Sequence, residues 1–528
     1  MSIPPKTTVA PAVESLLEQW AASPTTHPRV GDWRRAGYRR GAPLPRRVEG
    51  PTIDAGARGI VAGEHDVSAA LQQLLDELEA SGGVLQLGPG RYTLNEPLLI
   101  HGSNVVLRGA GTSETTLYFP RTLGDSFGPA LFRESTAWSW TGGHIYFVSR
   151  DRLERSRDAD WGGFEGWIVG DKLAKLSAAE RGTYVVTVDG ADRITPGAIV
   201  LLEVPDDDEH TVLQEMAGGI PGAAEYDWET RAATIAGTDR YPDFDAYRWP
   251  VRVVAVDGPR ITLEQPLKIG IPVGATAWSI GPTVHDSGVE SLTIENKVVP
   301  QTTHNINPGS NGVCFHAVHD CWARDVRVLN ADLAFGFTAA KSCQLTGISA
   351  GGRSLHHFVA CRVQSHDNLI EDFRLDEFTV SAVAGSYLHG LNVEGFSSGN
   401  VYRRGVLHTG TFDSHRQLPF ENLRTAITVT NKDAVPGGAR NAGPYFGARS
   451  VNWGIDVTNG NNLCMDITDM APRSLTAGIT GLDQRGSILP RGGPDFDGPL
   501  DSETIAFGDD LGPLRDLLEV QRDVAPIA

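Results

Sequence analysis

The chain has 528 residues, 40% of them apolar, with a formal net charge of −19 and an isoelectric point near 5.2. Such a chain can bury a sizeable core, and its negative field excludes nucleic acid and anionic membranes as expected partners. Glycine (60 residues) and proline (32) are abundant, which favours a turn-rich β protein over a helical one.

The cysteine spacing fits no zinc-finger pattern, so free and largely buried thiols are expected. The five cysteines are Cys314, Cys321, Cys343, Cys361 and Cys464. The N-terminal segment lacks the apolar run of a signal peptide, and no stretch is long enough to span a membrane. We therefore expect a cytoplasmic protein, or a secreted one if a leader has been removed.

Residues 1–50 form an N-terminal extension, with one helix expected from Val13 to Ala22 and then a basic, proline-rich run that follows the surface. Residues 51–148 begin with a turn from Asp54 to Gly59. A helical stripe follows over 67–80 and ends at Ser81-Gly82-Gly83. Short strands then alternate with turns at even intervals, which is typical of the stacked turns of a solenoid.

This segment resembles the N-terminal cap and first coils of the pectate-lyase superfamily. The shared pattern is D-x-G-A-x-G at 54–59, a helix with A-L-Q at 70–72, and G-G-V-L-Q-L at 82–87. The chain departs from it at Ile60-Val61, where Asp-Gly is usual. The resemblance implies an all-β fold, a right-handed parallel β-helix with an N-terminal helical cap. It implies no particular chemistry, because several activities share this cap.

Residues 149–282 have longer alternating strands and Asp-Gly turns at 189–190 and 257–258, which predict a small antiparallel β insertion. Its acidic stretch 205–245 is expected to be an exposed loop, with a Ca²⁺ site as the alternative.

Residues 283–470 return to the solenoid rhythm as the β-helix body, and 471–528 form a C-terminal loop and helix cap, with the helix near 513–520. Four apolar positions lie 22, 25 and 20 residues apart, the length of one coil, and are expected to stack: Val326, Ile348, Phe373 and Val393.

Nine of the fifteen histidines fall between His304 and His415, and imidazoles move protons near neutral pH. His366 and His389 are 23 residues apart and are expected to stack. His316 and His319 flank an apolar strand and are expected to pack in the core. Trp322 and Trp453 are expected in the core as well.

The body also resembles a group of β-helix proteins related to polysaccharide lyases and to glycoside-hydrolase family 28. The shared features are the His356-His357 pair, S-G-N-V at 398–401 and D-x-H-R at 413–416. The tripeptides of the polygalacturonase site are absent. A hydrolase needs two carboxylates across the bond, and the candidates are Asp367, Asp372, Asp376, Glu377 and Asp413.

Elimination from a uronate instead needs a cation, a base and an acid, which Arg, His and Tyr supply. We therefore expect a polysaccharide lyase, with His415 or His366 as base, Tyr402 as acid, and Arg404 and Arg416 on the substrate carboxylate. The other expected catalytic residues are His389, His408 and Asp413, and the expected substrate-binding residues are His356, His357 and Arg403.

The alternatives are a glycoside hydrolase, a cytoplasmic isomerase or cyclase of a small metabolite, and a non-catalytic, tailspike-like glycan-binding protein. The expected partner is a carbohydrate or small-molecule substrate, and the expected assembly is a monomer or small homo-oligomer. No metal ligands are expected and no cofactor is expected to be required.

Overall fold

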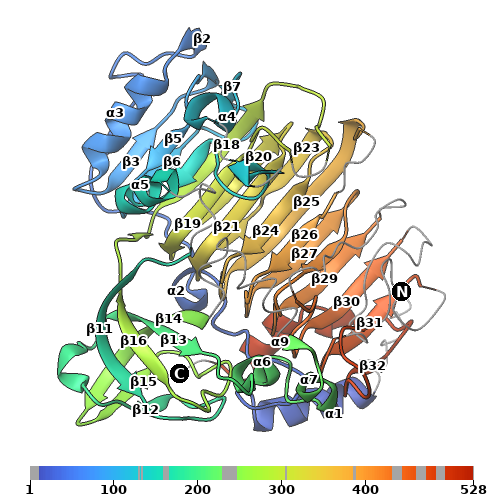
Figure 1. The fold of residues 1–528 in the computed structure, drawn as a ribbon. Coiled ribbons are helices and arrows are strands. Elements are labelled where there is room, and N and C mark those ends of the chain that lie inside the picture. Colours follow the sequence, from blue (N-terminus) through green and yellow to red (C-terminus); the bar gives the residue numbers. More distant parts are fainter. Residues whose placement is uncertain are drawn as a thin grey trace, which may run out of the picture.

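The structure is a computed structural model that describes residues 11–128, 131–132, 135–158, 166–228, 246–303, 306–383, 388–430, 443–458, 471–482 and 494–526. Within these ranges the chain is mostly β, and its parallel strands run side by side along a solenoid (Figure 1). The predicted right-handed parallel β-helix is confirmed. No helix in the described ranges is long and apolar enough to cross a membrane.

A long parallel sheet runs the length of the solenoid and has 16 strands within the described residues. In spatial order its main path is β1 (Thr52–Asp54), β3 (Gly83–Gln86), β6 (Val105–Arg108), β18 (Gly288–Asn296), β20 (Trp322–Leu329), β22 (Gln344–Thr346), β25 (Leu369–Val380), β27 (Val401–Leu407), β29 (Leu423–Val429), β30 (Val451–Val457), β31 (Leu475–Thr480) and β32 (Glu503–Ile505). The strands β2 (Gly63–Asp66), β4 (Gly90–Thr93), β7 (Thr115–Phe119) and β23 (Ser349–Arg353) pair beside this path.

A second parallel sheet, the eight-stranded sheet, faces the long sheet across the apolar core. Its strands are β5 (Leu98–Ile100), β10 (Ile145–Phe147), β17 (Val284–His285), β19 (Val313–His319), β21 (Leu333–Lys341), β24 (His357–Arg362), β26 (Leu391–Glu394) and β28 (Phe412–His415). Like residues stack between coils inside this core: Phe147, Phe315 and Phe337 have ring centroids 4.7 and 5.3 Å apart.

The turn that joins the two sheets carries an asparagine ladder. The side-chain amide of Asn368 donates to Asn400 Oδ1 at 2.9 Å, and that of Asn400 donates to Asn422 Oδ1 at 3.0 Å. Each of these Oδ1 atoms also accepts a backbone N–H from the preceding coil. Buried polar groups need such partners, so the ladder holds successive coils in register.

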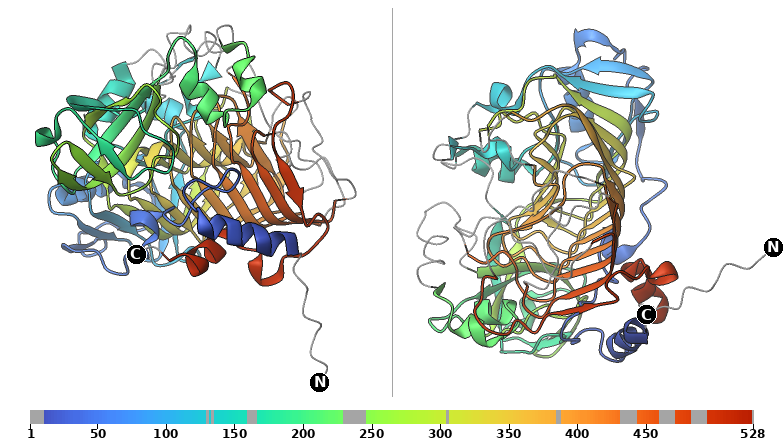
Figure 2. Two further views of the ribbon diagram at one scale, coloured as in Figure 1. Left: turned by 90° about the horizontal axis from the view of Figure 1, so that it is seen from below. Right: turned by 90° about the vertical axis from the view of Figure 1, so that its right-hand side faces the viewer.

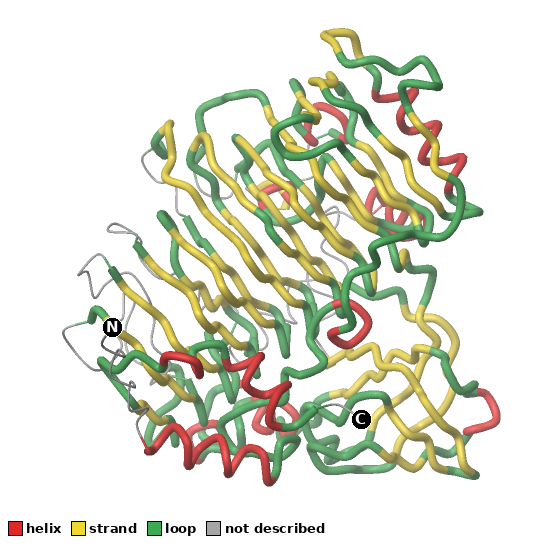
Figure 3. Tube along the Cα trace, turned by 180° about the vertical axis from the view of Figure 1, so that it is seen from behind, coloured by secondary structure: helices red, strands yellow, loops and turns green. Residues whose placement is uncertain are grey.

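Helices close the ends of the solenoid, as the view from behind shows (Figure 3). Helix α3 (Ser68–Leu78) buries a stripe of leucines over the first coils: Leu71, Leu74, Leu75 and Leu78. At the other end, α1 (Pro11–Ala22) lies across the C-terminal strands of the long sheet with α9 (Leu517–Val524) (Figure 2). Both predicted tryptophans, Trp322 and Trp453, are buried, as are the four cysteines within the described residues. Cys464 lies outside those residues.

An antiparallel sheet, the insertion sheet, is formed by β11 (Val169–Leu176), β12 (Val185–Thr187), β13 (Ile199–Pro205), β14 (Ala246–Asp257), β15 (Arg260–Leu263) and β16 (Ala275–Ile280). The Asp257-Gly258 turn closes the β14–β15 hairpin as predicted. The predicted hairpin at Asp189-Gly190 is wrong, because β12 pairs with β15 and not with β13, the next strand.

The remaining α-helices are short: α2 (Tyr38–Gly41), α4 (Leu123–Phe127), α5 (Arg150–Asp158), α6 (Thr211–Met216) and α7 (Pro221–Ala224). The described residues also contain the strand pair β8 (Leu131–Phe132) and β9 (Ser135–Thr136) and three 3-10 helices, at Ala137–Ser139, Ala191–Arg193 and Gly512–Leu514. Of the acidic stretch 205–245, residues 229–245 lie outside the described ranges. The domain boundaries remain a prediction.

Candidate functional site

Polar side chains gather on the outer face of the eight-stranded sheet, where β24, β26 and β28 lie next to one another. Alternate residues of β26 and β28 point in opposite directions, so Leu391, Val393 and Phe412 enter the core. Their neighbours face outward. The register places Asn392 beside Asp413 and Glu394 beside His415. On the other side of β26, Cys361 pairs with Val393, so the next residue of β24, Arg362, lies level with Glu394.

Five of these residues form what we call the histidine cluster: His356, His357, His389, Asp413 and His415. The rings of His356 and His357 lie 5.0 and 4.8 Å from that of His389, and the ring of His415 lies 5.2 Å from it. All five residues are buried. The predicted site residues His389, His415, Asp413, His356 and His357 are thus brought together.

Asp413 lies between two imidazoles. Its Oδ2 is 3.4 Å from Nδ1 of His389 and 3.4 Å from Nδ1 of His415, and it accepts a hydrogen bond from the Asn392 side chain. The other oxygen, Oδ1, has no hydrogen-bond partner within the described residues. A buried carboxylate in this position stabilises positive charge that develops on either neighbouring ring.

Two guanidinium groups border the cluster. Arg416 Nη2 lies 2.9 Å from His415 Nε2, and Arg362 Nη2 lies 3.3 Å from His357 Nε2. Both arginines also approach Glu394, at 3.3 Å for Arg362 and 3.8 Å for Arg416. Burial, together with the positive charge of neighbouring histidines and Arg362, holds the pKa of His357 well below its usual value.

The cluster also brings metal-ligand atoms together. The triads His356-His357-His389 and His389-Asp413-His415 each hold their candidate atoms within 4.8 Å of one another. However, a guanidinium donates to the Nε2 atom of both His357 and His415, so these rings carry their neutral-form proton on Nδ1, which in His415 faces Asp413. This arrangement suits proton transfer better than metal ligation.

Four predicted residues lie away from the cluster on the long sheet. Tyr402 points into the solenoid core, where its hydroxyl donates to the Asn392 carbonyl at 2.8 Å, so it does not reach the outer-face site. Arg403 and Arg404 form ion pairs with Glu371 and Asp516. His408 lies beside Thr430 at the end of β27.

His366 lies apart as well, beneath the insertion sheet. Its Nδ1 is 3.0 Å from Ser398 Oγ and its Nε2 is 2.9 Å from the Arg248 carbonyl. The predicted stacking of His366 on His389 is wrong, because the coil at this point is 32 residues long and Ser398 is the residue in register with His366.

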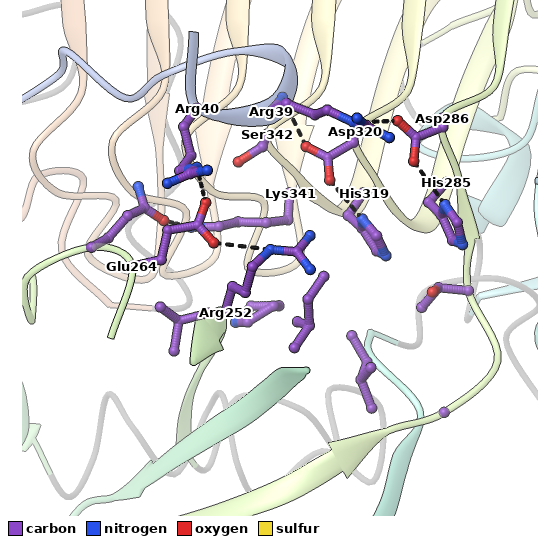
Figure 4. A pocket seen from close by; sticks show the side chains of 17 residues that line it. Arg39, Arg40, Arg252, Glu264, His285, Asp286, His319, Asp320, Lys341 and Ser342 are labelled. Carbon is purple, nitrogen blue, oxygen red and sulfur yellow. Dashed lines mark hydrogen bonds and ion pairs between the residues drawn. The ribbon is translucent and has the colours of Figure 1, made fainter. Parts of the chain in front are cut away.

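A second feature, which we call the dyad pocket, is a hollow of about 670 Å³ between the N-terminal segment, the solenoid turns and the insertion sheet (Figure 4). It is lined by His285, Asp286, His319, Asp320, Arg39 and Arg252, among others. His316 is fully buried as predicted, whereas 10% of the His319 side chain is exposed at this pocket.

The dyad pocket was not predicted from the sequence, although the sequence contains a signal for it. The dipeptide His-Asp occurs four times in the sequence. At 285–286, 319–320 and 366–367 it lies where the chain leaves the eight-stranded sheet for the long sheet, whereas His65-Asp66 lies within β2. At the first three the aspartate has a positive φ, of 53 to 55°. Within the solenoid body the repeated dipeptide therefore marks a repeated turn.

No family model and no curated protein matches this chain. Among solved structures, the chain is similar to the tailspike protein gp49 of Pseudomonas phage LKA1, with 12% identity and a TM-score of 0.39 over 80% of this chain and 67% of that one. It is also similar to the A-module of the mannuronan C-5 epimerase AlgE6 of Azotobacter vinelandii (11% identity, TM-score 0.33, 87% and 97% covered). A third similar structure is an exopolygalacturonase of Thermotoga maritima (10%, 0.32, 89% and 91%). The parallel β-helix of this chain is shown by its own strand pairing, and similarities this low carry no residue or activity to it.

Proposed function

We propose that the chain is a carbohydrate-active enzyme that cleaves a uronate-containing glycan by β-elimination at the histidine cluster. The observation that supports this most is the contact of 2.9 Å between Arg416 Nη2 and His415 Nε2, with Asp413 on the other side of the same ring. In a uronate, the carbon that loses a proton also bears the carboxylate. A guanidinium beside an imidazole therefore matches both groups that the first step requires.

In this mechanism Arg416 and Arg362 bind the substrate carboxylate, which stabilises the negative charge that develops at C5. Once Arg416 has turned to the carboxylate, His415 Nε2 is free to take the C5 proton. The electron pair forms the C4–C5 double bond, the C4–O bond breaks, and the leaving oxygen takes a proton from a second group. His389 in its protonated form is our candidate for that donor, because it shares Asp413 with His415.

A glycoside hydrolase is the second candidate, because two carboxylates lie on neighbouring strands of this face. Asp413 on β28 pairs with Asn392 on β26, and Glu394 lies two residues after Asn392 on β26. The two acids are therefore diagonal neighbours on the same face of the sheet. Glu394 already contacts two guanidiniums, and Asp413 already contacts two imidazoles and the Asn392 amide, whereas hydrolysis needs one of the two acids to donate a proton to the leaving oxygen. This is why we favour elimination.

The test is an incubation in D₂O with alginate, polygalacturonate and hyaluronan, and with a neutral β-glucan as control. A lyase gives the ultraviolet absorbance of an unsaturated uronate together with new chain ends. A hydrolase gives chain ends without that absorbance. An epimerase or isomerase gives deuterium at C5 without either, and a tailspike-like binding protein gives none of these signals.

On a confirmed substrate, His415→Gln and Arg416→Gln should each lower turnover by roughly 10²-fold or more, the usual size of such contributions. His408→Gln is the matched control, because His408 lies on the long sheet outside the cluster. Near-normal turnover of His415→Gln would remove the histidine cluster from the mechanism.

A further inference from the structure

The dyad pocket contains two histidine–aspartate pairs of the same geometry, one on each of two successive coils. Nδ1 of His285 is 2.9 Å from Oδ2 of Asp286, and Nδ1 of His319 is 2.9 Å from Oδ2 of Asp320. The two histidines are in register, and their rings stack with centroids 4.9 Å apart and an angle of 11° between their planes. With Nδ1 directed at the carboxylate, each ring turns its Nε2 away from it.

The N-terminal segment holds both carboxylates from behind. Arg39 Nε contacts Asp286 at 2.7 Å, the Arg39 backbone N–H donates to Asp320 at 2.9 Å, and the Tyr38 hydroxyl donates to Asp286 at 2.8 Å. Although burial acts in the opposite direction, hydrogen bonds from His285, Arg39 and Tyr38 lower the pKa of Asp286. An ionised aspartate fixed in this way orients its histidine and favours the imidazolium form.

Cationic groups complete the lining. Arg252 and Arg40 share Glu264, and Lys341 lies in register with His319 on the next coil, where it contacts Gln265 and Asp367. Figure 4 shows the Arg252 guanidinium and the two imidazole rings facing the same opening. Even with both histidines neutral, the lining has more basic than acidic side chains. The four basic ones are Arg39, Arg40, Arg252 and Lys341, and the three acidic ones are Asp286, Asp320 and Glu264.

We propose that the dyad pocket binds a small sugar ligand that carries an oxyanion, either a carboxylate or a phosphate. The imidazolium Nε2–H groups of His285 and His319 and the guanidinium of Arg252 contact the anion, and charge-assisted hydrogen bonds of this kind are the strong ones. A hollow of about 670 Å³ is within the range of small-molecule sites. This binding site is separate from the histidine cluster and does not depend on the reaction proposed there.

Protonation is coupled to binding, since each neutral ring has only one N–H and Asp286 or Asp320 already accepts it. Binding therefore strengthens as the pH falls from 8 to 6. The other charged or titratable groups that face the rings are Arg39 and Tyr38 from the N-terminal segment, Arg252 and Glu264 from the insertion, and Lys341 from the next coil. Burial and the hydrogen bond to Asp286 raise the pKa of Tyr38, whereas burial lowers that of Lys341 against the opposing charge of Asp367.

Isothermal titration calorimetry with glucuronate, glucose 6-phosphate and neutral glucose tests the proposal on the full chain. We expect at least one of the two anions to bind, about tenfold more tightly at pH 6 than at pH 8, with proton uptake visible as a dependence of the heat on the buffer. Binding of glucuronate alone identifies a carboxylate ligand, and binding of glucose 6-phosphate alone identifies a phosphate ester.

His319→Gln and Arg252→Gln should each weaken binding by about tenfold or more. His65→Gln, the same substitution at an exposed histidine on β2, should leave it unchanged. His415→Gln should also bind normally, which separates this proposal from the catalytic one. Equal binding of glucose, no binding of either anion at millimolar concentration, or unchanged affinity in the folded His319→Gln and Arg252→Gln variants would each overturn it.

Discussion

Asp413 is fully buried on β28, and its Oδ2 lies 3.4 Å from the Nδ1 atom of His415, two residues further along the same strand. Residues two apart on a strand share a face, so the carboxylate supports the ring at fixed geometry. We expect Asp413→Asn to lower turnover by about 10²-fold or more while the protein stays folded, because the amide keeps the size but not the charge that stabilises an imidazolium. Turnover and melting temperature measured on the same sample check this. A folded variant with full activity would contradict a supporting role for Asp413.

Several buried histidines predict that the protein loses stability in mild acid. Burial lowers the pKa of His27 and His144 to about 4 and that of His366 to about 3, and it also lowers that of His316. In the unfolded chain these groups titrate near pH 6.5, so below that pH the unfolded state takes up protons that the folded state does not. Stability should therefore fall as the pH drops below about 6.5, by at most about 1.4 kcal/mol per pH unit for each histidine.

Two buried carboxyls act in the opposite direction. Burial raises the pKa of Asp516 to about 6 and also raises that of Glu371, so as the pH falls the folded state takes up protons at these groups before the unfolded chain does, which stabilises the fold. Chemical denaturation at pH 7.5, 6.5 and 5.5 measures the net effect. His366→Gln should reduce the slope between pH 6.5 and 5.5, whereas His65→Gln should not. Stability that is constant or rises as the pH falls from 6.5 to 5.5 would contradict the prediction.

The coil length shows where sequence periodicity succeeded and where it failed. Val326, Ile348 and Phe373 are in register as predicted, but the residue that follows Phe373 in register is Gly405, 32 positions later, and not Val393. The extra residues lie between β25 and β26, and they carry His389 to the start of β26. A periodic pattern cannot anticipate an insertion of this kind, although the insertion is what completes the histidine cluster.

The direction of side chains was harder to predict than the strands themselves. Val401 and Tyr402 are consecutive and both fully buried, Val401 against the helices at the C-terminal end and Tyr402 in the solenoid core. Because α1 and α9 cover the outer face of the long sheet at Val401, the first residues of β27 are apolar on both faces and the usual alternation is lost there. The motif D-x-H-R at 413–416, in contrast, lies on an outer face that carries polar groups, and the sequence did indicate those residues.

The asparagine ladder should be a major source of stability. The side-chain amide of Asn400 donates to Ser365 O and to Asn422 Oδ1. Its Oδ1 accepts two hydrogen bonds, from the backbone N–H and from the side-chain amide of Asn368. Asn400→Ala removes all four hydrogen bonds and leaves buried partners unsatisfied, so we expect a loss of roughly 3 kcal/mol in the free energy of unfolding. Urea denaturation measures it. A loss below about 1 kcal/mol would mean that the ladder contributes little to holding the coils in register.

Tyr402→Phe tests which residue protonates the leaving oxygen, Tyr402 as expected from the sequence or His389 as proposed from the structure. If Tyr402 were the catalytic acid, removal of its hydroxyl would lower turnover by about 10²-fold or more, because phenylalanine has no proton to donate. In the structure that hydroxyl is buried inside the solenoid and donates to the Asn392 carbonyl, on the opposite side of the sheet from the histidine cluster. We therefore expect turnover within about threefold of the unmodified protein and a stability loss of about 1 kcal/mol, the usual size for one buried hydrogen bond. Phe412→Leu serves as a control for disturbance of the core next to the site, since Phe412 packs inward from β28. If the Tyr402→Phe protein were folded but inactive while the Phe412→Leu protein remained active, Tyr402 would have to be a catalytic residue.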